Sequence, residues 1–184
     1  MLRRESGAQR KTGYDLLHVA GGRRWICIDA RLPPRLVEEG LRAGKIAELK
    51  GLYPLRREIR LGDGRIDLLL AGMPGPCYVE AKAVTLVAGR TAIFPDAPTQ
   101  RGRRHLLALL RARREGSKAA VVFVVQRADA LRFAPNWSTD PGFARMLVRA
   151  AAAGVLVLAY ACHVTCMDVT LMHSLPVLLD TRVR

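Results

Sequence analysis

The residues best suited to chemistry are two carboxylates and a lysine, Asp67, Glu80 and Lys82. Glu80 and Lys82 lie two positions apart in an otherwise apolar run, and a β-strand would place both side chains on one face. Asp67 lies in the apolar run just before it. If the two runs pair as a symmetric hairpin, Leu70 faces Cys77 and Asp67 faces Glu80. The hairpin would then bring all three groups together.

Opposed carboxylates in an antiparallel pair lie about 5 Å apart at Cβ and repel each other unless a cation lies between them. Mg²⁺, or Mn²⁺ in its place, suits such a gap, and the backbone carbonyl of Ala81 is a further natural ligand. Lys82 could hold an attacking water or neutralise charge that develops on phosphorus. This pattern predicts metal-dependent hydrolysis of phosphodiester bonds.

The alternative is a surface Glu-Lys pair beside an unrelated Asp67, since Glu-x-Lys triplets are common by chance. What favours a site is the apolar sequence around these charges. Buried charges need partners or a metal.

Charge indicates the class of partner. The chain of 184 residues has a formal net charge of +14 and a pI near 10.8, so its positive field favours polyanions, DNA in particular. Only five of the 30 basic residues are lysines, and the chain is rich in Ala, Leu and Gly. A GC-rich genome would produce that bias without selection for binding, so charge alone leaves both explanations open.

The first residues and the apolar runs indicate where in the cell the protein is expected. The charged start, Met-Leu-Arg-Arg-Glu, lacks the apolar core of a signal peptide, which predicts a cytoplasmic protein. The longest uncharged apolar stretch, 150–162, is too short to span a bilayer. We therefore expect no membrane span.

The four cysteines lie in or beside apolar runs, which predicts buried free thiols. Cys162, His163 and Cys166 are the one cluster to weigh as a zinc site. An alternating strand would put Cys162 and His163 on opposite faces, which argues against zinc.

Local patterns predict the elements that position these residues. In the first half of the chain, glycine and proline pairs separate the predicted elements. Gly40 and Gly44 interrupt the helical pattern of residues 35–49. The expected elements are strands over 14–19 and 24–30 around a turn at 21–22, a helix over 35–49, and strands over 55–61, 65–70 and 77–86.

In the second half, Thr99 is placed to cap a helix over 100–114, and Asp140 to cap one over 142–153 that Gly154 ends. The continuous apolar run 119–126 is typical of a strand buried on both faces. Strands over 155–164 and 169–179 follow. This order predicts an α/β fold with a mixed sheet flanked by helices.

Several motifs in this order resemble the sugar fermentation stimulation protein family. They are Gly-Arg-Ile-Asp-Leu-Leu-Leu at 64–70, Cys-Tyr-Val-Glu-Ala-Lys-Ala-Val-Thr-Leu at 77–86, Phe-Pro-Asp-Ala-Pro-Thr-Gln-Arg-Gly at 94–102, His105, and the segments 133–135 and 140–141. The resemblance implies a PD-(D/E)XK restriction-endonuclease-like domain over 31–184. It also implies an OB-like N-terminal domain involved in DNA binding, of which residues 1–30, a basic tail and β-hairpin, would be a remnant or linker.

The resemblance assigns Asp67, Glu80 and Lys82 to the nuclease-like signature. Gln100 stands where the family usually has glutamate, and a neutral amide cannot supply charge to a metal site. Glu48 matches a family glutamate, and it is either the accessory acid that many such nucleases add from their first helix or a solvated side chain.

Arg101, Arg103, Arg104 and His105 begin the second long helix, where cationic side chains and free N–H groups attract phosphate. Ordinary solvent-facing arginines are the competing explanation. Two functions follow as hypotheses: a Mg²⁺-dependent nuclease, or a non-catalytic DNA-binding regulatory protein of sugar metabolism that keeps the nuclease fold.

Overall fold

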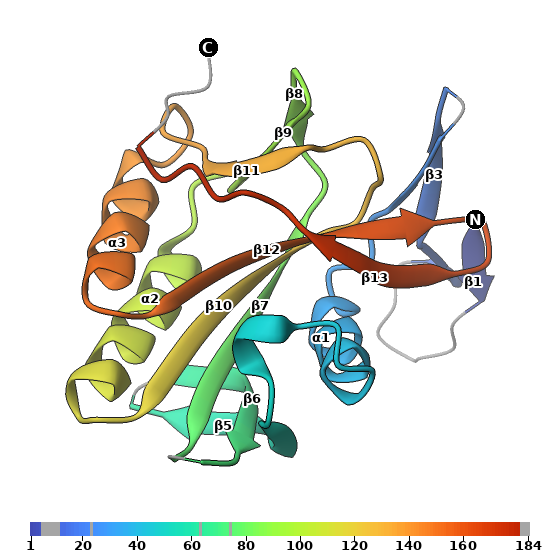
Figure 1. The fold of residues 1–184 in the computed structure, drawn as a ribbon. Helices are drawn as coiled ribbons and strands as arrows, with labels where there is room; N and C mark the ends of the chain where they lie inside the picture. Colours follow the sequence, from blue (N-terminus) through green and yellow to red (C-terminus); the bar gives the residue numbers. More distant parts are fainter. Residues whose placement is uncertain (5–11, 23, 63, 74, 181–184) are drawn as a thin grey trace.

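The computed structural model describes residues 1–4, 12–22, 24–62, 64–73 and 75–180, and its centre is a six-stranded sheet (Figure 1). The strand order is β13-β12-β10-β7-β6-β5. β10 is parallel to β7 and β12, and the other pairs are antiparallel, so the sheet is mixed, as predicted. The strands are β5 (Tyr53–Leu61), β6 (Gly64–Ala71), β7 (Cys77–Val84), β10 (Lys118–Val125), β12 (Leu156–Val164) and β13 (Val169–Ser174).

β10 occupies the middle of the sheet because it is apolar on both faces. Every side chain from Ala119 to Val125 is buried. Val122 and Val124 join one hydrophobic core, while Val121 and Phe123 join a second core on the other side. The expectation of a central strand buried on both faces is confirmed.

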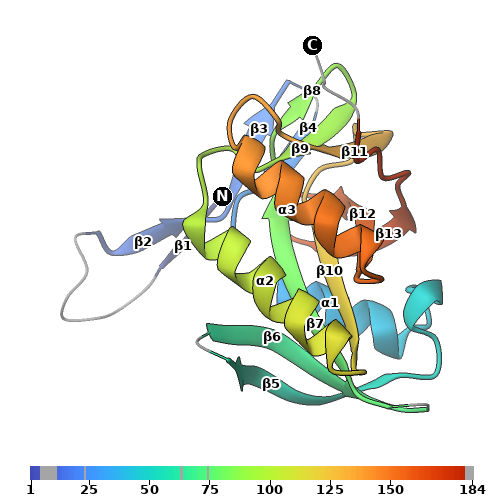
Figure 2. The same ribbon diagram turned by 90° about the vertical axis from the view of Figure 1, so that its left-hand side faces the viewer.

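Helices cover both faces of the sheet, as Figures 1 and 2 show. α1 (Pro33–Arg42) covers one face, where Leu36 and Val37 belong to the core, and we call this the α1 face. α2 (Gln100–Arg114) and α3 (Pro141–Ala152) pack side by side on the other, where Leu109 and Leu147 belong to the core. We call it the α2 face.

Two caps start the helices of the α2 face where the sequence predicts. Thr99 Oγ1 accepts a hydrogen bond from Gly102 N at 2.9 Å, and Asp140 Oδ1 accepts one from Phe143 N at 2.8 Å. Asp140 Oδ2 also accepts from Thr99 N at 2.9 Å, so one carboxylate joins the starts of both helices. The predicted end of the second of these helices is confirmed as well, since Gly154 follows α3 with a φ of 87°.

The helix predicted over 35–49 is wrong in its second half. α1 ends at Arg42, Gly44 adopts a φ of 65°, and a short 3-10 helix, η1 (Ala47–Leu49), follows. Gly40 lies inside α1, where a Cβ would meet Leu171 Cδ2 at 2.6 Å. A larger residue would therefore displace the Leu171 side chain of β13.

A second, three-stranded sheet has no counterpart in the predicted elements. It consists of β8 (Val87–Ala88), β9 (Thr91–Phe94) and β11 (Arg132–Pro135). The strand predicted over 77–86 ends at Val84, and the one over 169–179 ends at Ser174. β9 pairs in parallel with β11 across about forty residues of chain, a contact that no local pattern contains.

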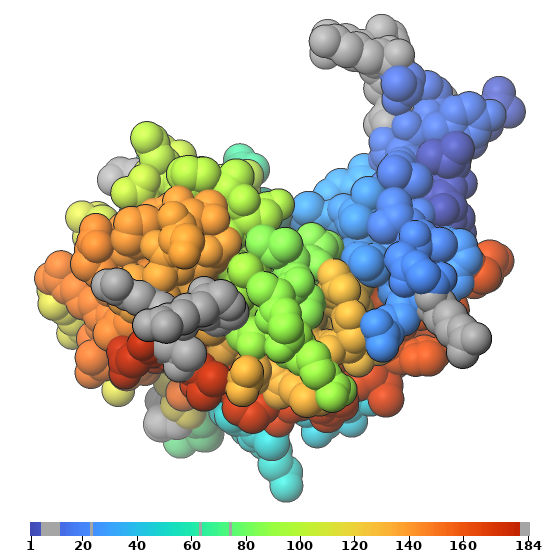
Figure 3. All heavy atoms as spheres, turned by 90° about the horizontal axis from the view of Figure 1, so that it is seen from above, coloured from blue at the N-terminus to red at the C-terminus, as the bar shows by residue number. Residues whose placement is uncertain are grey.

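The N-terminal segment forms β1 (Leu2–Arg4), β2 (Tyr14–Leu16), β3 (His18–Gly21) and β4 (Arg24–Cys27), and Figure 3 shows it, in blue, at one side of the body. The β3–β4 hairpin turns where predicted, but the strand over 14–19 is divided between β2 and β3. Residues 2–4, expected in a basic tail, pair with β2, and residues 5–11 of that tail lie outside the described residues. Gln126 bonds this segment to the end of β10, donating to Cys27 O at 3.0 Å.

The cysteines are free, and three of the four are buried. Cys166 is exposed, which corrects the expectation for that residue. Cys162 is buried in β12 and His163 is exposed, as strand alternation requires. Within the described ranges no helix is long and apolar enough to cross a membrane.

Candidate metal-dependent active site

The β6–β7 hairpin has the predicted register. Leu70 pairs with Cys77, and the paired ladder continues to Leu68 and Val79. It stops one pair before Asp67 and Glu80. Beyond this point the Asp67 side chain replaces a backbone acceptor of β6, because its Oδ2 accepts a hydrogen bond from Ala81 N of β7 at 2.8 Å. The carboxylate of Asp67 is thus held at the point where the two strands separate.

Glu80 is buried on the α2 face with an incomplete set of partners. Its Oε1 accepts a hydrogen bond from Lys82 Nζ at 2.5 Å and lies against His105 Nδ1. Its Oε2 is buried and has no hydrogen-bond partner among the described residues. An unpaired buried carboxylate oxygen is unfavourable unless a cation or a donor completes it.

Lys82 and His105 both contact the same oxygen of Glu80. Lys82 Nζ lies 3.1 Å from His105 Nδ1. Both side chains are largely withdrawn from solvent, and their nitrogen atoms surround one oxygen of Glu80. The sheet contributes Glu80 and Lys82, and α2 contributes His105, so packing of the helix on the sheet assembles the cluster.

The pKa values of the two carboxylates are shifted in opposite directions. Burial raises the pKa of Asp67 to about 6, and the negative charge of Glu80 adds to this effect. Burial also acts to raise the pKa of Glu80, but hydrogen bonding from His105 and the charge of Lys82 hold that pKa below its ordinary value. Glu80 therefore stays ionised, and its negative charge makes ionisation of Asp67 less favourable. A cation between the two carboxylates would relieve their repulsion.

Similarity to known proteins assigns this chain to a family. A family model described as the sugar fermentation stimulation protein RE domain matches residues 31–167. The sugar fermentation stimulation protein homolog of Moorella thermoacetica is 47% identical over 164 residues, 89% of this chain and 71% of that protein. The chain belongs to the sugar fermentation stimulation protein family.

Other members agree with this assignment. The homolog of Geobacter sulfurreducens is 46% identical over 171 residues, covering 92% of this chain and 73% of that protein. A solved structure titled as Pyrococcus furiosus SfsA in complex with Ca²⁺ matches with a TM-score of 0.88 at 31% identity. That match covers 96% of this chain and 76% of the other chain.

Glu48, one of the two accessory candidates, contacts the opposite face of the sheet from Glu80. Glu48 lies in η1, not in a long helix, and its Oε2 accepts a hydrogen bond from Tyr160 OH at 2.6 Å. Tyr160 belongs to the core of the α1 face, whereas Glu80 lies on the α2 face. Gln100 is exposed at the first position of α2.

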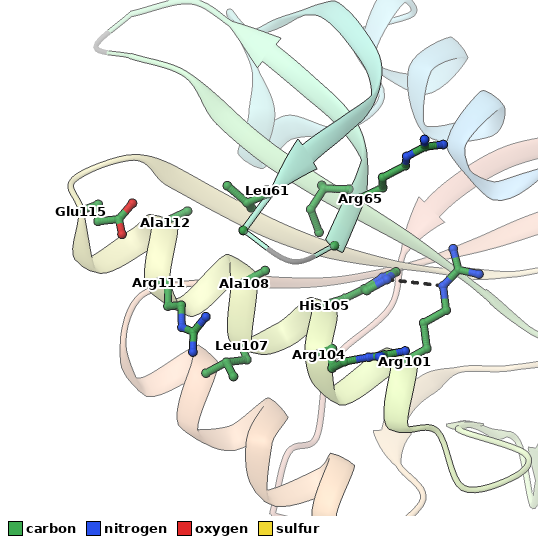
Figure 4. Close-up of a pocket in the computed structure, with 13 residues that line it drawn as sticks. Leu61, Arg65, Arg101, Arg104, His105, Leu107, Ala108, Arg111, Ala112 and Glu115 are labelled. Carbon is green, nitrogen blue, oxygen red and sulfur yellow. Dashed lines mark hydrogen bonds between the residues drawn. The ribbon is translucent and has the colours of Figure 1, made fainter.

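The four basic residues at the start of α2 separate into distinct environments. Arg101 and Arg104 are exposed, and Figure 4 shows both on the same helix as His105, with a hydrogen bond from Arg101 Nε to His105 Nε2 at 3.4 Å. Arg103 Nε lies 3.8 Å from Asp140 Oδ2. His105 is buried in the carboxylate cluster, and its Nε2 is in contact with the exposed Arg101.

The spacing of apolar residues along α2 could have predicted that His105 faces the sheet. The buried residues of α2 are Gly102, His105, Leu106, Leu109, Leu110 and Ala112. His105 precedes Leu109 by four positions, so it lies on the apolar stripe of the helix and faces the sheet. A histidine on such a stripe, opposite a strand that carries two charged residues, is a candidate partner for them.

Proposed function

We propose that this family member is a divalent-metal-dependent nuclease of the PD-(D/E)XK type that hydrolyses phosphodiester bonds of DNA or RNA. The observation that carries the proposal is the buried Oε2 of Glu80, which lies beside Asp67 and has no partner in the part of the chain that the structure describes. A site that leaves a carboxylate oxygen without a donor, next to a second carboxylate, is complementary to a cation.

The residues present fit a hard divalent ion. Asp67 and Glu80 supply carboxylate oxygens, and Mg²⁺ or Mn²⁺ keeps water molecules for the rest of its coordination. In a strand the N–H and C=O of one residue point toward the same neighbour. Because Ala81 N bonds Asp67, the carbonyl of Ala81 is also directed toward the place where β6 separates, which suits it as a third ligand.

The number of protein ligands is small. No group of three His, Cys, Asp or Glu side chains is arranged to hold a metal ion in the described part of the chain. Waters and a substrate phosphate would therefore complete the coordination, as is usual for Mg²⁺. The relative from Pyrococcus furiosus is titled as a complex with Ca²⁺, another hard divalent ion, which supports this choice of ligand class.

The chain's own residues have definable roles in hydrolysis. A bound metal would act as a Lewis acid on the phosphate and lower the pKa of its water. Lys82 Nζ, held by Glu80 Oε1, is positioned to orient the attacking water and to neutralise charge on the phosphate. His105 is a positioning residue, because it contacts Lys82 and Glu80.

A second function is favoured by the arginines of α2. A non-catalytic DNA-binding regulatory protein that keeps the fold would use Arg101, Arg103 and Arg104 for phosphate contacts alone. It would bind nucleic acid with a strong dependence on salt and would not cleave with divalent ions. The family name points to sugar metabolism as the process concerned.

Calorimetric titration with Mn²⁺ separates these functions when it is combined with cleavage assays. The nuclease proposal expects one bound ion in the wild type and none in Asp67→Asn. It also expects Mg²⁺- or Mn²⁺-dependent cleavage of DNA or RNA that Lys82→Ala loses. Lys118→Ala, a charge change at the start of β10, is the matched control and should retain activity. Equal cleavage by Lys82→Ala and the wild type would remove the assigned role of Lys82.

A further inference from the structure

A groove lies between the β5–β6 hairpin and the outward side of α2, next to the candidate active site (Figure 4). Its volume is about 570 Å³, in the range of sites that bind small organic groups. Leu61, Gly62, Gly64, Arg65 and Ile66 contribute from the hairpin. We call it the arginine groove.

The charge of the arginine groove is positive and largely unpaired. Arg65, Arg101, Arg104 and Arg111 line it, and Glu115 is the one acidic side chain among its described lining residues. Arg101 contacts His105, but the other three arginines form no ion pair within the described ranges. Unpaired arginines around a hollow favour an anionic ligand, and guanidinium groups match phosphate geometry.

The spacing along α2 suits an extended ligand with several phosphates. Arg101, Arg104 and Arg111 lie on the groove side of the helix, and ten residues of helix rise by about 15 Å. That length corresponds to about four nucleotides at 3.4 Å per step of one strand. A single inorganic phosphate would leave most of these side chains unused.

The floor of the arginine groove is apolar, and this decides which nucleic acid it fits. Its members are Leu61, Ile66, Ala108 and Ala112, whereas Leu107 projects beside Arg111 at the edge of the groove (Figure 4). Phosphates gain nothing from such a floor, whereas the face of an unstacked base does. In a duplex the base faces are covered by their neighbours, so only an unpaired segment can use the apolar floor and the arginines together.

His105 connects the arginine groove to the candidate active site. One side of its ring contacts Glu80 and Lys82, and the residue also lines the groove. A strand lying in the groove therefore runs toward the carboxylates. Arg101, bonded to His105 Nε2, lies at the junction of the two sites.

We propose that the arginine groove binds an unpaired segment of nucleic acid, so that the protein prefers single strands or frayed ends to blunt duplex. The inference rests on the proposed function, because it names the substrate class of that same site. It adds Arg65, Arg111 and the apolar floor to the residues that contact substrate.

Fluorescence anisotropy in EDTA tests binding without any metal-dependent step. The probes are a labelled single-stranded oligonucleotide and the blunt duplex of the same sequence. The wild type should bind the single strand at least fivefold more tightly. Arg104→Ala/Arg111→Ala should weaken binding of the single strand at least tenfold and reduce the salt slope by about 1.4, because two phosphate contacts are lost. Ala108→Glu, which keeps a good helix former, should weaken it similarly through charge.

The matched control is Arg145→Ala/Arg149→Ala, which removes the same charge from exposed positions of α3. It should change affinity less than threefold, and circular dichroism should show each variant folded. Equal losses in both double variants, or equal affinity for duplex and single strand, would overturn the proposal. Groove-dependent binding without cleavage in Mn²⁺ would refute only the nuclease function, and unchanged cleavage by Arg104→Ala/Arg111→Ala would refute only the arginine groove.

Discussion

On the α1 face the buried carboxylate of Glu38 has both oxygens paired, one with Arg42 at 2.5 Å and the other with Arg57. On the α2 face the buried carboxylate of Glu80 has two nitrogen partners on one oxygen and none, within the described residues, on the other. The two glutamates are almost equally withdrawn from solvent, at 4% and 2% exposure. Burial alone therefore does not distinguish a structural acid from a functional one.

The arginines differ in the same way between the two regions. Arg35, Arg42 and Arg57, which belong to α1 and β5, each pair with a glutamate. Arg104 and Arg111 on α2 have no such partner in the described structure. A paired charge holds its own surroundings in place, whereas an unpaired charge in a concave site is available to a ligand.

The largest expected effect comes from exchanging each buried glutamate for glutamine. Glu80→Gln should lower Mg²⁺- or Mn²⁺-dependent cleavage at least 100-fold, because an amide cannot supply the negative charge that a metal needs. Its thermal stability in metal-free protein should also fall, because the buried Lys82 and His105 lose a charged partner. Cleavage and differential scanning calorimetry on the same preparations measure both quantities.

Glu38→Gln is the matched variant on the α1 face, and it differs from Glu80→Gln in its expected effect on cleavage. Cleavage should stay within twofold, while the free energy of unfolding should fall by about 1–3 kcal/mol, because two arginines lose a buried partner. Loss of cleavage in Glu38→Gln with full stability would contradict the distinction between the two faces.

A smaller effect is expected from Asp67→Asn in metal-free protein. Because the folded pKa of Asp67 lies near 6, above the unfolded value, ionisation of Asp67 destabilises the wild type progressively as pH rises from about 4 to 6. Asparagine can still accept from Ala81 N but carries no charge. Asp67→Asn should therefore be more stable than the wild type by roughly 1–3 kcal/mol at pH 7.5, and about equal at pH 4.

Added Mn²⁺ should invert that order, since it stabilises only the protein that binds it. Urea denaturation at pH 4, 5.5 and 7.5, with EDTA or Mn²⁺, makes the measurement. A wild type that is the more stable protein at pH 7.5 in EDTA would show that burial and the charge of Glu80 do not raise the pKa of Asp67.

The smallest effect should follow Tyr160→Phe, which removes the hydrogen bond to Glu48 on the α1 face. Loss of one partly exposed hydrogen bond should reduce stability by about 1 kcal/mol or less. Metal affinity and cleavage should not change in Tyr160→Phe or in Glu48→Gln. A weaker Mn²⁺ titration in Glu48→Gln would instead make Glu48 an accessory acid of the site.

Local rules account for what could be predicted from the sequence. The pairing of Leu70 with Cys77, the caps at Thr99 and Asp140, and the buried run of β10 each depend on a few neighbouring residues and on strand or helix periodicity. The shared face of Glu80 and Lys82 follows from the same alternation. These features needed no knowledge of the remaining chain.

Tertiary structure decided the features that join distant segments. The pairing of β9 with β11, the fit of Gly40 against Leu171 and the contact of Glu48 with Tyr160 all cross long stretches of sequence. Only packing of α2 on the sheet brought His105 to Glu80. Periodicity fixes which face a side chain takes, but the partner it meets there depends on how whole elements pack. For that reason the sequence alone predicted that Asp67 and Glu80 lie together, and the fold revealed that one oxygen of Glu80 has no partner among the described residues.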